Sequence, residues 1–436
     1  MITLRNSILC IAINLCCVGN VAANDPFAEL DHEVSQLSVD DSNEFNQWYA
    51  AHINEFTQWQ IAYLEDWDKQ QQDSIARWGD AKTSSQDLIV VVDNKSYSRT
   101  VIDLKNNQIT IDIKPNESTV NKQQQLDSIN NVIASNQELL TSIGLTTPIT
   151  AKPDTTKVID VKLDSDVINH VQNTIKAQTE RQMSQLDIYT EQSEVLTDEA
   201  IKEQVLIEQK RVMKAHELER VAKLEDNFKK NQQTLARAPI KLVQYRVDIP
   251  TSAISERAKN YMPYIYVESV KQNLPAPLIL AIMHTESHFN PKAKSHVPAF
   301  GLMQIVPNTA GHDVNKLYRG KDKPMSANEL YNPQVNIETG TAYLKILKSR
   351  YLKGIKDPQS ATYAVIAAYN TGSGNIAKAF GLKSVNMTVK KINTMSSQQV
   401  YQHLMTNLPY KETRNYLEKV NSKLKTYSEK NKSSTI

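Results

Sequence analysis

The sequence predicts a multidomain α+β protein: a helical and β-rich N-terminal part with a long helical arm, then an all-α C-terminal domain. Length is the first observation, because 436 residues exceed one compact domain and imply two or three folded units. The second is that eight of the eleven glycines follow residue 250. Third, helix-sized segments with clear stops succeed one another there, whereas β-branched runs lie earlier.

Residues 1–23 have the features of a secretory signal peptide. Arg5 precedes an apolar run from Ile8 to Val18, and the small-residue pattern Val21-Ala22-Ala23 suits a cleavage site. The apolar run is about half of the roughly 20 residues that cross a bilayer, which disfavours a retained membrane helix. We therefore expect an exported protein of the periplasm, with peripheral attachment to the outer membrane as a further option.

The cysteines bear on disulfides and on lipid anchoring. All three lie within the signal, at Cys10, Cys16 and Cys17. A chain cleaved after Ala23 has no cysteine, so disulfides are not expected to stabilise it. The residues that precede the cysteines are not the small ones that a lipid-attachment signal requires, so there is no clear lipobox.

Charge is divided unequally along the chain. Residues 251–436 contain 25 Lys and Arg against 11 Asp and Glu, a net charge of +14, while the remainder carries 25 against 37, or −12. The C-terminal part is therefore expected to favour an anionic partner or polymer. No compact basic run with interleaved aromatic residues points to nucleic acid, and no such partner is expected.

The N-terminal domain is assigned to residues 24–250. Its first segment, Asp25–Gly79, is predicted to be an amphipathic helix, because aromatic residues recur at three- and four-residue steps. We favour packing of this stripe on its own domain, with contact to a partner or a glycan as the alternative. The stripe comprises Phe45, Trp48, His52, Phe56, Trp59, Tyr63 and Trp67.

Strands are predicted after this helix. Leu88–Val92 is a compact β-branched run, and Val101–Leu104 and Ile109–Ile113 flank Asn106-Asn107 as the arms of a hairpin. Two further strands are predicted at Val158–Leu163 and Lys241–Ile249.

The segment from about 164 to 236 is predicted to form a helical arm. It is polar, rich in charge and free of Gly and Pro, which favours long helices, with a coiled coil as one form. A solvated arm is the default expectation. Its charge also makes it a candidate contact for another cell-wall or envelope protein.

Residues 251–436 are assigned to the all-α C-terminal domain. Helix-sized segments with glycine-bearing turns follow one another there, without a convincing strand. The predicted helices are Ile254–Gln272, Pro277–Ser287, Gln334–Tyr351, Thr362–Asn370 and Lys411–Tyr427.

One glutamate in this domain has the pattern of a general acid. Glu286 falls near the end of a predicted helix, on the same face as Ile279, Ile282 and Met283, and Asn290-Pro291 ends that helix. Desolvation on an apolar face raises a carboxyl pKa, and the helix C-terminus acts in the same direction. The pattern therefore predicts a carboxylic acid that keeps its proton near neutral pH, as general-acid catalysis requires.

Two histidines beside this glutamate raise a zinc site as an alternative. His284 and His288 are four residues apart, but zinc peptidase helices place the glutamate next to a histidine, and here it lies midway. Surface or hydrogen-bonding histidines are the favoured interpretation, and no metal or cofactor is expected.

Four motifs resemble those of the soluble-lytic-type lytic transglycosylases. The E-S-x-F-N-P motif begins at Glu286, the loop Pro298–Pro307 contains Gly-Leu-Met-Gln, and Ala368–Gly374 and Glu412–Tyr416 follow in the family's order. The match covers roughly residues 255–425. The resemblance implies a lysozyme-like α fold for the C-terminal domain.

Further stretches narrow the resemblance to membrane-bound members of the family. Trp78-Gly79-Asp80 and the hairpin after it are similar to the N-terminal domain of those members, whereas the aromatic helix and the arm look like additions. The C-terminal stretches are Ile279–Met283, Asp313-Val314, Thr339–Leu344 and Ile392–Met395.

The resemblance implies non-hydrolytic cleavage of the β-1,4 bond between N-acetylmuramic acid and N-acetylglucosamine in peptidoglycan, leaving 1,6-anhydromuramyl ends. Glu286 would be first acid and then base, Ser295 would hydrogen-bond near the muramyl acetamido group, and Tyr416 would hold Glu286. Val297 departs from the polar residue that relatives often carry there. The remaining implied glycan-contacting residues are Gln304, Tyr343, Tyr369 and Asn370, with Met303 as an apolar floor.

Two alternatives stay open. A hydrolase resembling goose-type lysozyme needs a second carboxyl group at roughly 5 to 9.5 Å. Residues 287–312 contain no Asp or Glu, although Asp313 could fold close. A non-catalytic glycan-binding scaffold would instead use the aromatic helix and the arm. Separately from this choice, the alternative to a sugar-binding role is a core position for Tyr343 and Met303 and a helix-end cap for Asn370.

Overall fold

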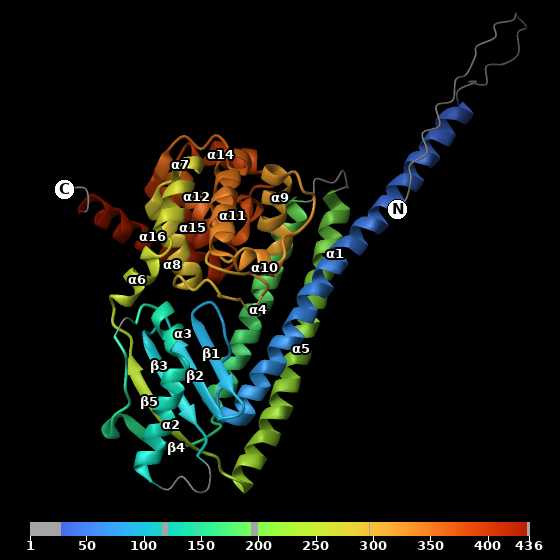
Figure 1. Cartoon of the computed structure of the whole chain (residues 1–436). Coiled ribbons are helices and arrows are strands. Elements are labelled where there is room, and N and C mark those ends of the chain that lie inside the picture. The colour runs from blue at the N-terminus through green and yellow to red at the C-terminus, as the bar shows by residue number, and fades with distance from the viewer. Residues whose placement is uncertain (1–27, 116–120, 146, 193–198, 296, 434–436) are drawn as a thin grey trace, which may run out of the picture. The chain divides into compact units, whose positions relative to one another are not determined.

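The computed structural model describes residues 28–115, 121–145, 147–192, 199–295 and 297–433 (Figure 1). The signal peptide predicted at 1–23 lies outside the described residues. The chain divides into two units, Met1–Ala50 and Ala51–Ile436, and helix α1 (Ala28–Trp78) belongs to both. Among the described helices, none combines the length and the apolar character needed to span a membrane.

An antiparallel sheet lies at the centre of residues 88–248. Its strand order is β1-β2-β3-β5-β4. The pair β2–β3 is the predicted hairpin, and β1–β2 is a second hairpin that the sequence analysis did not predict. The hairpin turn between β2 and β3 places Asn107 at φ 52°, a left-handed conformation that asparagine tolerates. The strands are β1 (Leu88–Asp93), β2 (Ser98–Asp103), β3 (Gln108–Ile113), β4 (Thr156–Asp160) and β5 (Lys241–Asp248).

Two helices that the sequence analysis did not predict cover one face of this sheet. They are α2 (Lys122–Ser135) and α3 (Gln137–Ser142), and a short 3₁₀ turn, η1 (Pro153–Thr155), precedes β4. The apolar side of α2 packs on isoleucines of β2 and β3, including Ile102 and Ile109. Half of its residues are Gln, Asn or Ser, so the apolar stripe is narrow and easily overlooked.

The predicted arm consists of two long helices, α4 (Ser165–Gln192) and α5 (Glu199–Arg237). They pack on each other and on residues 51–78 of α1 as a three-helix bundle. The aromatic stripe turns inward over this part of α1, where Phe56 and Trp67 are buried. One end of the bundle has an apolar core of Ile75, Leu163, Val171, Ile175, Leu224 and Phe228.

The expectation of a solvated arm is wrong for the middle of α4. Gln178, Gln182 and Gln185 expose 0–1% of their surface, and Thr179 is also buried. Polar composition predicts exposure only where a polar face meets water. Here the polar face of one helix packs against polar groups of its neighbours, as when Gln60 of α1 donates to Gln185 at 2.8 Å.

Residues 253–433 form the helical C-terminal part, so the predicted multidomain α+β class is confirmed. A single helix over Ile254–Gln272 is wrong: a new helix begins at Met262 with Pro263 in its first turn, because proline lacks the N–H that a helix interior needs. The helices are α6 (Ala253–Lys259), α7 (Met262–Gln272), α8 (Ala276–Ser287), α9 (His312–Arg319), α10 (Ala327–Leu330), α11 (Pro333–Ile346), α12 (Pro358–Thr371), α13 (Ser373–Ala379), α14 (Val385–Ile392), α15 (Ser397–Asn407) and α16 (Lys411–Ser433), with π-helical turns η2 (Pro307–Gly311) and η3 (Leu347–Tyr351).

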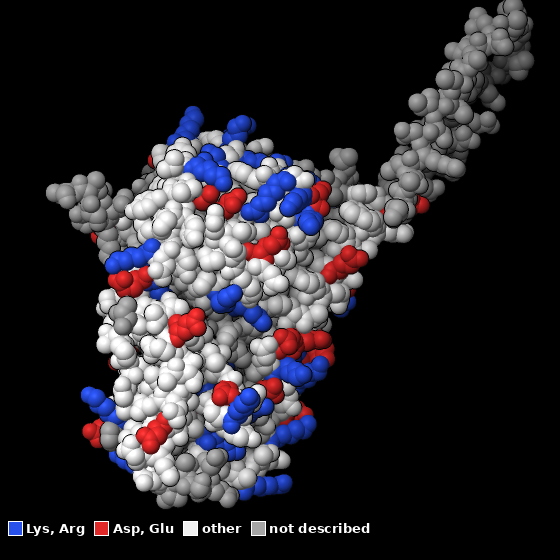
Figure 2. All heavy atoms as spheres, in the orientation of Figure 1, with Lys and Arg blue, Asp and Glu red and all other residues white. Residues whose placement is uncertain are grey.

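Surface charge follows the division seen in the sequence. On the face shown in Figure 2, Lys and Arg gather over the helical C-terminal part, while acidic and basic side chains are mixed over the sheet and the lower bundle. Part of the excess positive charge of residues 251–436 therefore lies on this face of the helical C-terminal part.

Candidate active site

Helix α8 carries the predicted acid at its C-terminal end. Ile279, Ile282 and Met283 are fully buried and hold the helix in the core of the C-terminal part. The helix ends after Ser287, because His288 takes a left-handed conformation at φ 49° and donates its backbone N–H to the His284 carbonyl. The stop thus comes slightly before the Asn-Pro pair that predicts it.

The carboxyl of Glu286 is 6% exposed. Burial raises its pKa from 4.5 to about 7, because removal from water penalises the charged form. Hydrogen bonding toward Tyr416 and the positive charge of Arg181 oppose this rise, and the charge of Glu412 adds to it. Among the described residues, the Tyr416 hydroxyl has no close hydrogen-bond partner, so its hydrogen bond to Glu286 is weak. Glu286 therefore holds its proton across much of the neutral range.

Aromatic residues from three helices surround this carboxyl. Burial raises the pKa of Tyr416 and of Tyr369 well above 10, and both feel the charge of Glu286. The Tyr369 hydroxyl donates to the Met303 carbonyl at 2.8 Å, and its ring lies 5.7 Å from that of Tyr343. Five of the predicted site residues thus form one contiguous cluster.

The loop after α8 is fixed by a buried amide that the sequence analysis missed. Asn336 of α11 accepts from the Met303 backbone N–H at 2.7 Å and donates to the carbonyls of Phe300 at 2.8 Å and Leu330 at 2.7 Å. Gly301 lies against this amide at φ +76°. A lone asparagine on an amphipathic helix carries no sequence signal for such a role.

We expect Gly301→Ala to destabilise the fold by at least about 2 kcal/mol, because the backbone is left-handed and the new Cβ has no space. That Cβ would lie 2.4 Å from both Asn336 Nδ2 and the Leu330 carbonyl oxygen. Gly320→Ala is the matched control: it also has positive φ, at +63°, but no atom within 4 Å of its Cβ. Urea unfolding of both variants checks this, and equal losses would contradict it.

The side-chain amide nitrogen of Gln304 forms hydrogen bonds within the same loop. Its Nε2 donates to the carbonyls of Ala293 at 3.2 Å and Gly301 at 2.9 Å. Its Oε1 is buried and has no hydrogen-bond partner within the described chain. That oxygen is available to accept a hydrogen bond from a ligand.

Ser295 lies on the loop after α8 and hydrogen-bonds to Val297 and to α1. Its hydroxyl oxygen accepts from the Val297 N–H at 3.3 Å, and its carbonyl accepts from the Tyr63 hydroxyl of α1 at 2.8 Å. No hydrogen bond of this residue in the described chain reaches Glu286. The hydrogen bond from Tyr63 of α1 joins residues that are 232 positions apart in the sequence, and no local sequence pattern indicates it.

Asn370 lies inside the last turn of α12, which ends with Gly372 as its cap, so Asn370 is not the terminal cap itself. Its side-chain oxygen accepts from Thr413 at 2.8 Å. Its backbone carbonyl accepts from Arg181 of α4. The arm therefore reaches the predicted site, which the sequence analysis did not foresee.

Comparison with known proteins concerns the helical C-terminal part. Residues 263–392 match the family model described as Transglycosylase SLT domain. We call this matched segment the SLT domain. The resemblance to the soluble-lytic-type enzymes is thereby confirmed, and it extends to curated relatives named membrane-bound lytic murein transglycosylase C.

Those relatives include proteins of Pectobacterium atrosepticum and Yersinia pestis. Each is 45% identical over 181 residues, which are 42% of this chain and 50% of the relative. The chain thus spans about half the length of the curated relatives it matches. Similar solved structures include a lytic transglycosylase Slt inactive mutant of Pseudomonas aeruginosa (20% identity, TM-score 0.32, 72% of this chain and 47% of that one) and the 70 kDa soluble lytic transglycosylase of Escherichia coli (17%, 0.31, 89% and 46%).

Two further carboxyl groups bear on the chemistry of the SLT domain. Asp313 accepts from the Tyr351 hydroxyl at 3.1 Å. Glu412 is close enough for its charge to raise the pKa of Glu286, and its side chain is 47% exposed. Of these two groups, Glu412 is therefore the one whose charge acts on Glu286. The sequence analysis quoted Glu412 in a motif without giving it a role.

His284 and His288, the two histidines beside Glu286, both contact other side chains of the chain. Tyr427 contacts His284 Nδ1 through its hydroxyl at 3.0 Å. Burial lowers the pKa of His288 to about 4, so this ring is neutral at pH 7. Their rings are 5.3 Å apart, edge to face.

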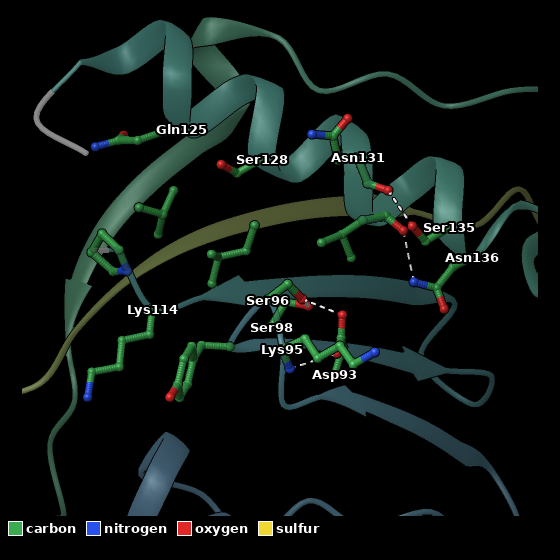
Figure 3. A pocket seen from close by; sticks show the side chains of 15 residues that line it. Asp93, Lys95, Ser96, Ser98, Lys114, Gln125, Ser128, Asn131, Ser135 and Asn136 are labelled. Carbon is green, nitrogen blue, oxygen red and sulfur yellow. Dashed lines mark hydrogen bonds between the residues drawn. The ribbon is translucent and has the colours of Figure 1, made fainter. Parts of the chain in front are cut away.

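A cavity of about 360 Å³ lies outside the SLT domain, between α2 and the turn that joins β1 to β2 (Figure 3). Polar side chains such as Lys95, Asn131 and Gln125 line it. Its carboxyl, Asp93, has a pKa lowered by a hydrogen bond from the Ser96 hydroxyl. An ionised carboxylate cannot donate a proton, so this cavity is a weaker candidate for acid catalysis than Glu286.

Proposed function

We propose that this chain is an exported, periplasmic lytic transglycosylase that cleaves the β-1,4 bond between N-acetylmuramic acid and N-acetylglucosamine in peptidoglycan. The observation that carries the proposal is the buried, proton-holding Glu286 within an SLT domain whose curated relatives are named lytic murein transglycosylases. The proposed organisation is a signal at 1–23, an N-terminal domain at 24–250 and the catalytic domain at 251–436.

In the first step Glu286 donates its proton to the bridging oxygen. The bond from that oxygen to the muramyl C1 breaks, the N-acetylglucosamine end leaves as an alcohol, and positive charge develops at C1. A neutral acid in a site shielded from water is suited to this transfer, because the carboxyl needs no prior protonation at neutral pH.

In the second step the new Glu286 carboxylate removes the proton from the muramyl C6 hydroxyl. The C6 oxygen forms a bond to C1, giving a 1,6-anhydro end and restoring the acid. No water is consumed, so the two products together have the mass of the substrate. One carboxyl thus serves as acid and then as base.

The remaining site residues are proposed to position the sugar. Tyr416 orients Glu286, and Ser295 binds near the muramyl acetamido group. Gln304 presents its unpaired Oε1 to a hydroxyl or amide. Tyr343, Tyr369 and Asn370 line the subsites over Met303.

Product analysis tests the reaction. Purified peptidoglycan is digested with the full chain, and the soluble fragments are separated and weighed by mass spectrometry. Muramyl ends that lack one water and resist borohydride reduction support the transglycosylase. Reducing ends would instead support a hydrolase, for which the charge of Glu412 near Glu286 is the favouring observation.

We expect the cleavage rate to fall with rising pH above neutrality. Because the pKa of Glu286 is raised to about 7, the acid form prevails below pH 7 and is lost above it. The rate at low substrate should fall about tenfold per pH unit on this limb. A pH–rate profile on soluble glycan strands checks this, and an alkaline limb that begins near pH 4.5 would contradict it.

A protein partner is proposed for the outer side of α5. Ile207 and Leu218 expose 62% and 64% of their surface there. An envelope protein that contacts this side should be released by Ile207→Glu, measured by cross-linking in whole cells, and unchanged cross-linking would exclude it.

A further inference from the structure

Helix α4 contacts the segment that carries the third SLT motif. Arg181 donates to the Asn370 carbonyl, and its guanidinium nitrogen lies 3.9 Å from a Glu412 carboxylate oxygen. One turn later, the hydroxyls of Ser184 and Thr371 are 2.9 Å apart. These residues of the arm therefore lie where the proposed sugar subsites begin.

The next turn of α4 continues the contact through Asp187. Lys378 reaches its carboxylate at 3.3 Å, Asn375 at 3.3 Å and the Tyr410 hydroxyl at 2.7 Å, while Lys210 of α5 binds it at 2.8 Å. Burial acts to raise the pKa of Asp187, but the positive charges of Lys210 and Lys378 outweigh this effect, so the pKa is lowered. The spacing of residues 181, 184 and 187 puts all three on one side of α4. We call this side the docking face.

The docking face meets the chain beside the proposed site, and the site residues themselves are buried. Glu286 exposes 6% of its surface, Asn370 3% and Tyr416 7%, although each must touch a sugar or its reacting atoms in the proposed reaction. Arg181 lies near enough for its charge to act on Glu286. A glycan strand and the docking face thus compete for the same segment.

Part of the packing around the docked stretch of α4 is polar. Among the described residues, the amide nitrogens of Gln178, Gln182 and Gln185 are buried without a hydrogen-bond partner, and each such group costs stability. Water can satisfy these amides when this stretch opens, which offsets part of the cost of opening.

We infer that α4 is a built-in, reversible inhibitor of the glycan site: its docking face occupies the segment at Asn370 and Glu412, and must move away before peptidoglycan binds. This inference rests on the proposed function. It gives the arm, which the family resemblance leaves without a role, a place in controlling the reaction. A polar contact suits this role, since it is exchanged for water at little cost when the arm leaves.

A disulfide that locks the arm tests the inference. The pair Ser184→Cys and Thr371→Cys replaces two hydroxyls in contact, and mass spectrometry verifies the bond. We expect the oxidised protein to cleave soluble glycan strands at least about tenfold more slowly than the same protein after reduction. The single-cysteine variants and the wild type, with its cysteines at 10, 16 and 17, should show no such redox dependence. Equal rates in both states would overturn the inference.

A second variant decides the matter if the bond does not form. Arg181→Ala weakens docking and should raise the initial rate about threefold or more, without moving the alkaline limb of the pH profile. Arg211→Ala, an exposed arginine of α5, is the matched control. A lower rate, or an alkaline limb of the pH profile shifted to higher pH, would show that Arg181 stays beside Glu286 during turnover. The arm would then be a permanent part of the glycan site and not an inhibitor.

A measurement of glycan binding tests this inference independently of the proposed cleavage reaction. In a Glu286→Gln background, the cysteine pair is titrated with purified glycan strands in both redox states. Binding that appears only after reduction supports the inference whatever bond is cleaved. Equal binding in both states overturns it. A wild type that binds glycan but releases no anhydro ends overturns the proposed function alone.

Discussion

Glu286→Gln is expected to lower the rate of glycan cleavage by about 100- to 10,000-fold, the range attributed to a positioned acid or base. Glutamine has the shape of the acid but no proton to give, and it cannot take one from the C6 hydroxyl afterwards. The measurement is release of soluble muropeptides from purified peptidoglycan. Glu268→Gln, at a second buried glutamate of the SLT domain, is the control and should retain activity within a few-fold.

The same variant supplies its own check of folding. The folded pKa of Glu286, about 7, lies above the unfolded value of 4.5, so the wild type loses stability as pH rises through that window. Glutamine does not titrate there, and it should therefore be the more stable protein above pH 7, by roughly 3 kcal/mol at most. The gain should vanish below pH 4.5. Activity equal to wild type at pH 6 would remove Glu286 from the mechanism.

Arg99→Met is expected to destabilise the N-terminal sheet by about 3–5 kcal/mol, the cost of leaving a buried charge without its partner. Arg99 pairs in register with Asp112 across β2 and β3 and binds it at 2.7 Å, and its other nitrogen reaches Asp80 at 2.6 Å. Asp112 is fully buried. Methionine fills a similar volume but leaves both carboxylates without this cation.

Chemical denaturation of the full chain measures the effect. Arg246→Met on β5 removes an exposed arginine from the same sheet and should change stability by less than about 0.5 kcal/mol. A second readout is the contact of Arg99 over the Trp78 ring, at 5.0 Å, whose loss should alter tryptophan fluorescence. A loss equal to that of the control would contradict the burial argument.

Local patterns in the sequence predicted the elements that bury an apolar face by themselves. The segment Ile109–Ile113 beside Asn106-Asn107 predicted β3, and the spacing of Ile279, Ile282 and Met283 placed Glu286 on the buried side of α8. Both predictions rest on short-range patterns that a single segment displays. The raised pKa of Glu286 follows from the same spacing.

Contacts between distant segments could not be predicted in this way. Arg181 approaches Glu286 only because α4 docks on the end of α12, and nothing in the composition of the arm indicates docking. Asn336 holds the loop through three hydrogen bonds that depend on tertiary structure. Polar residues also misled the analysis of the arm, because amides are read as exposed unless their partners are known.

The hydrogen bond from Tyr63 to the Ser295 carbonyl has a practical consequence for studying this protein. A recombinant fragment cut at residue 251 would lose that bond, along with the bond from Arg257 to the Ile143 carbonyl and the one from Arg181 to Asn370. Such a truncated SLT domain would present a different loop and an uncovered carboxyl. Its kinetics would describe the fragment, not the chain in which α1 and α4 contact the SLT domain.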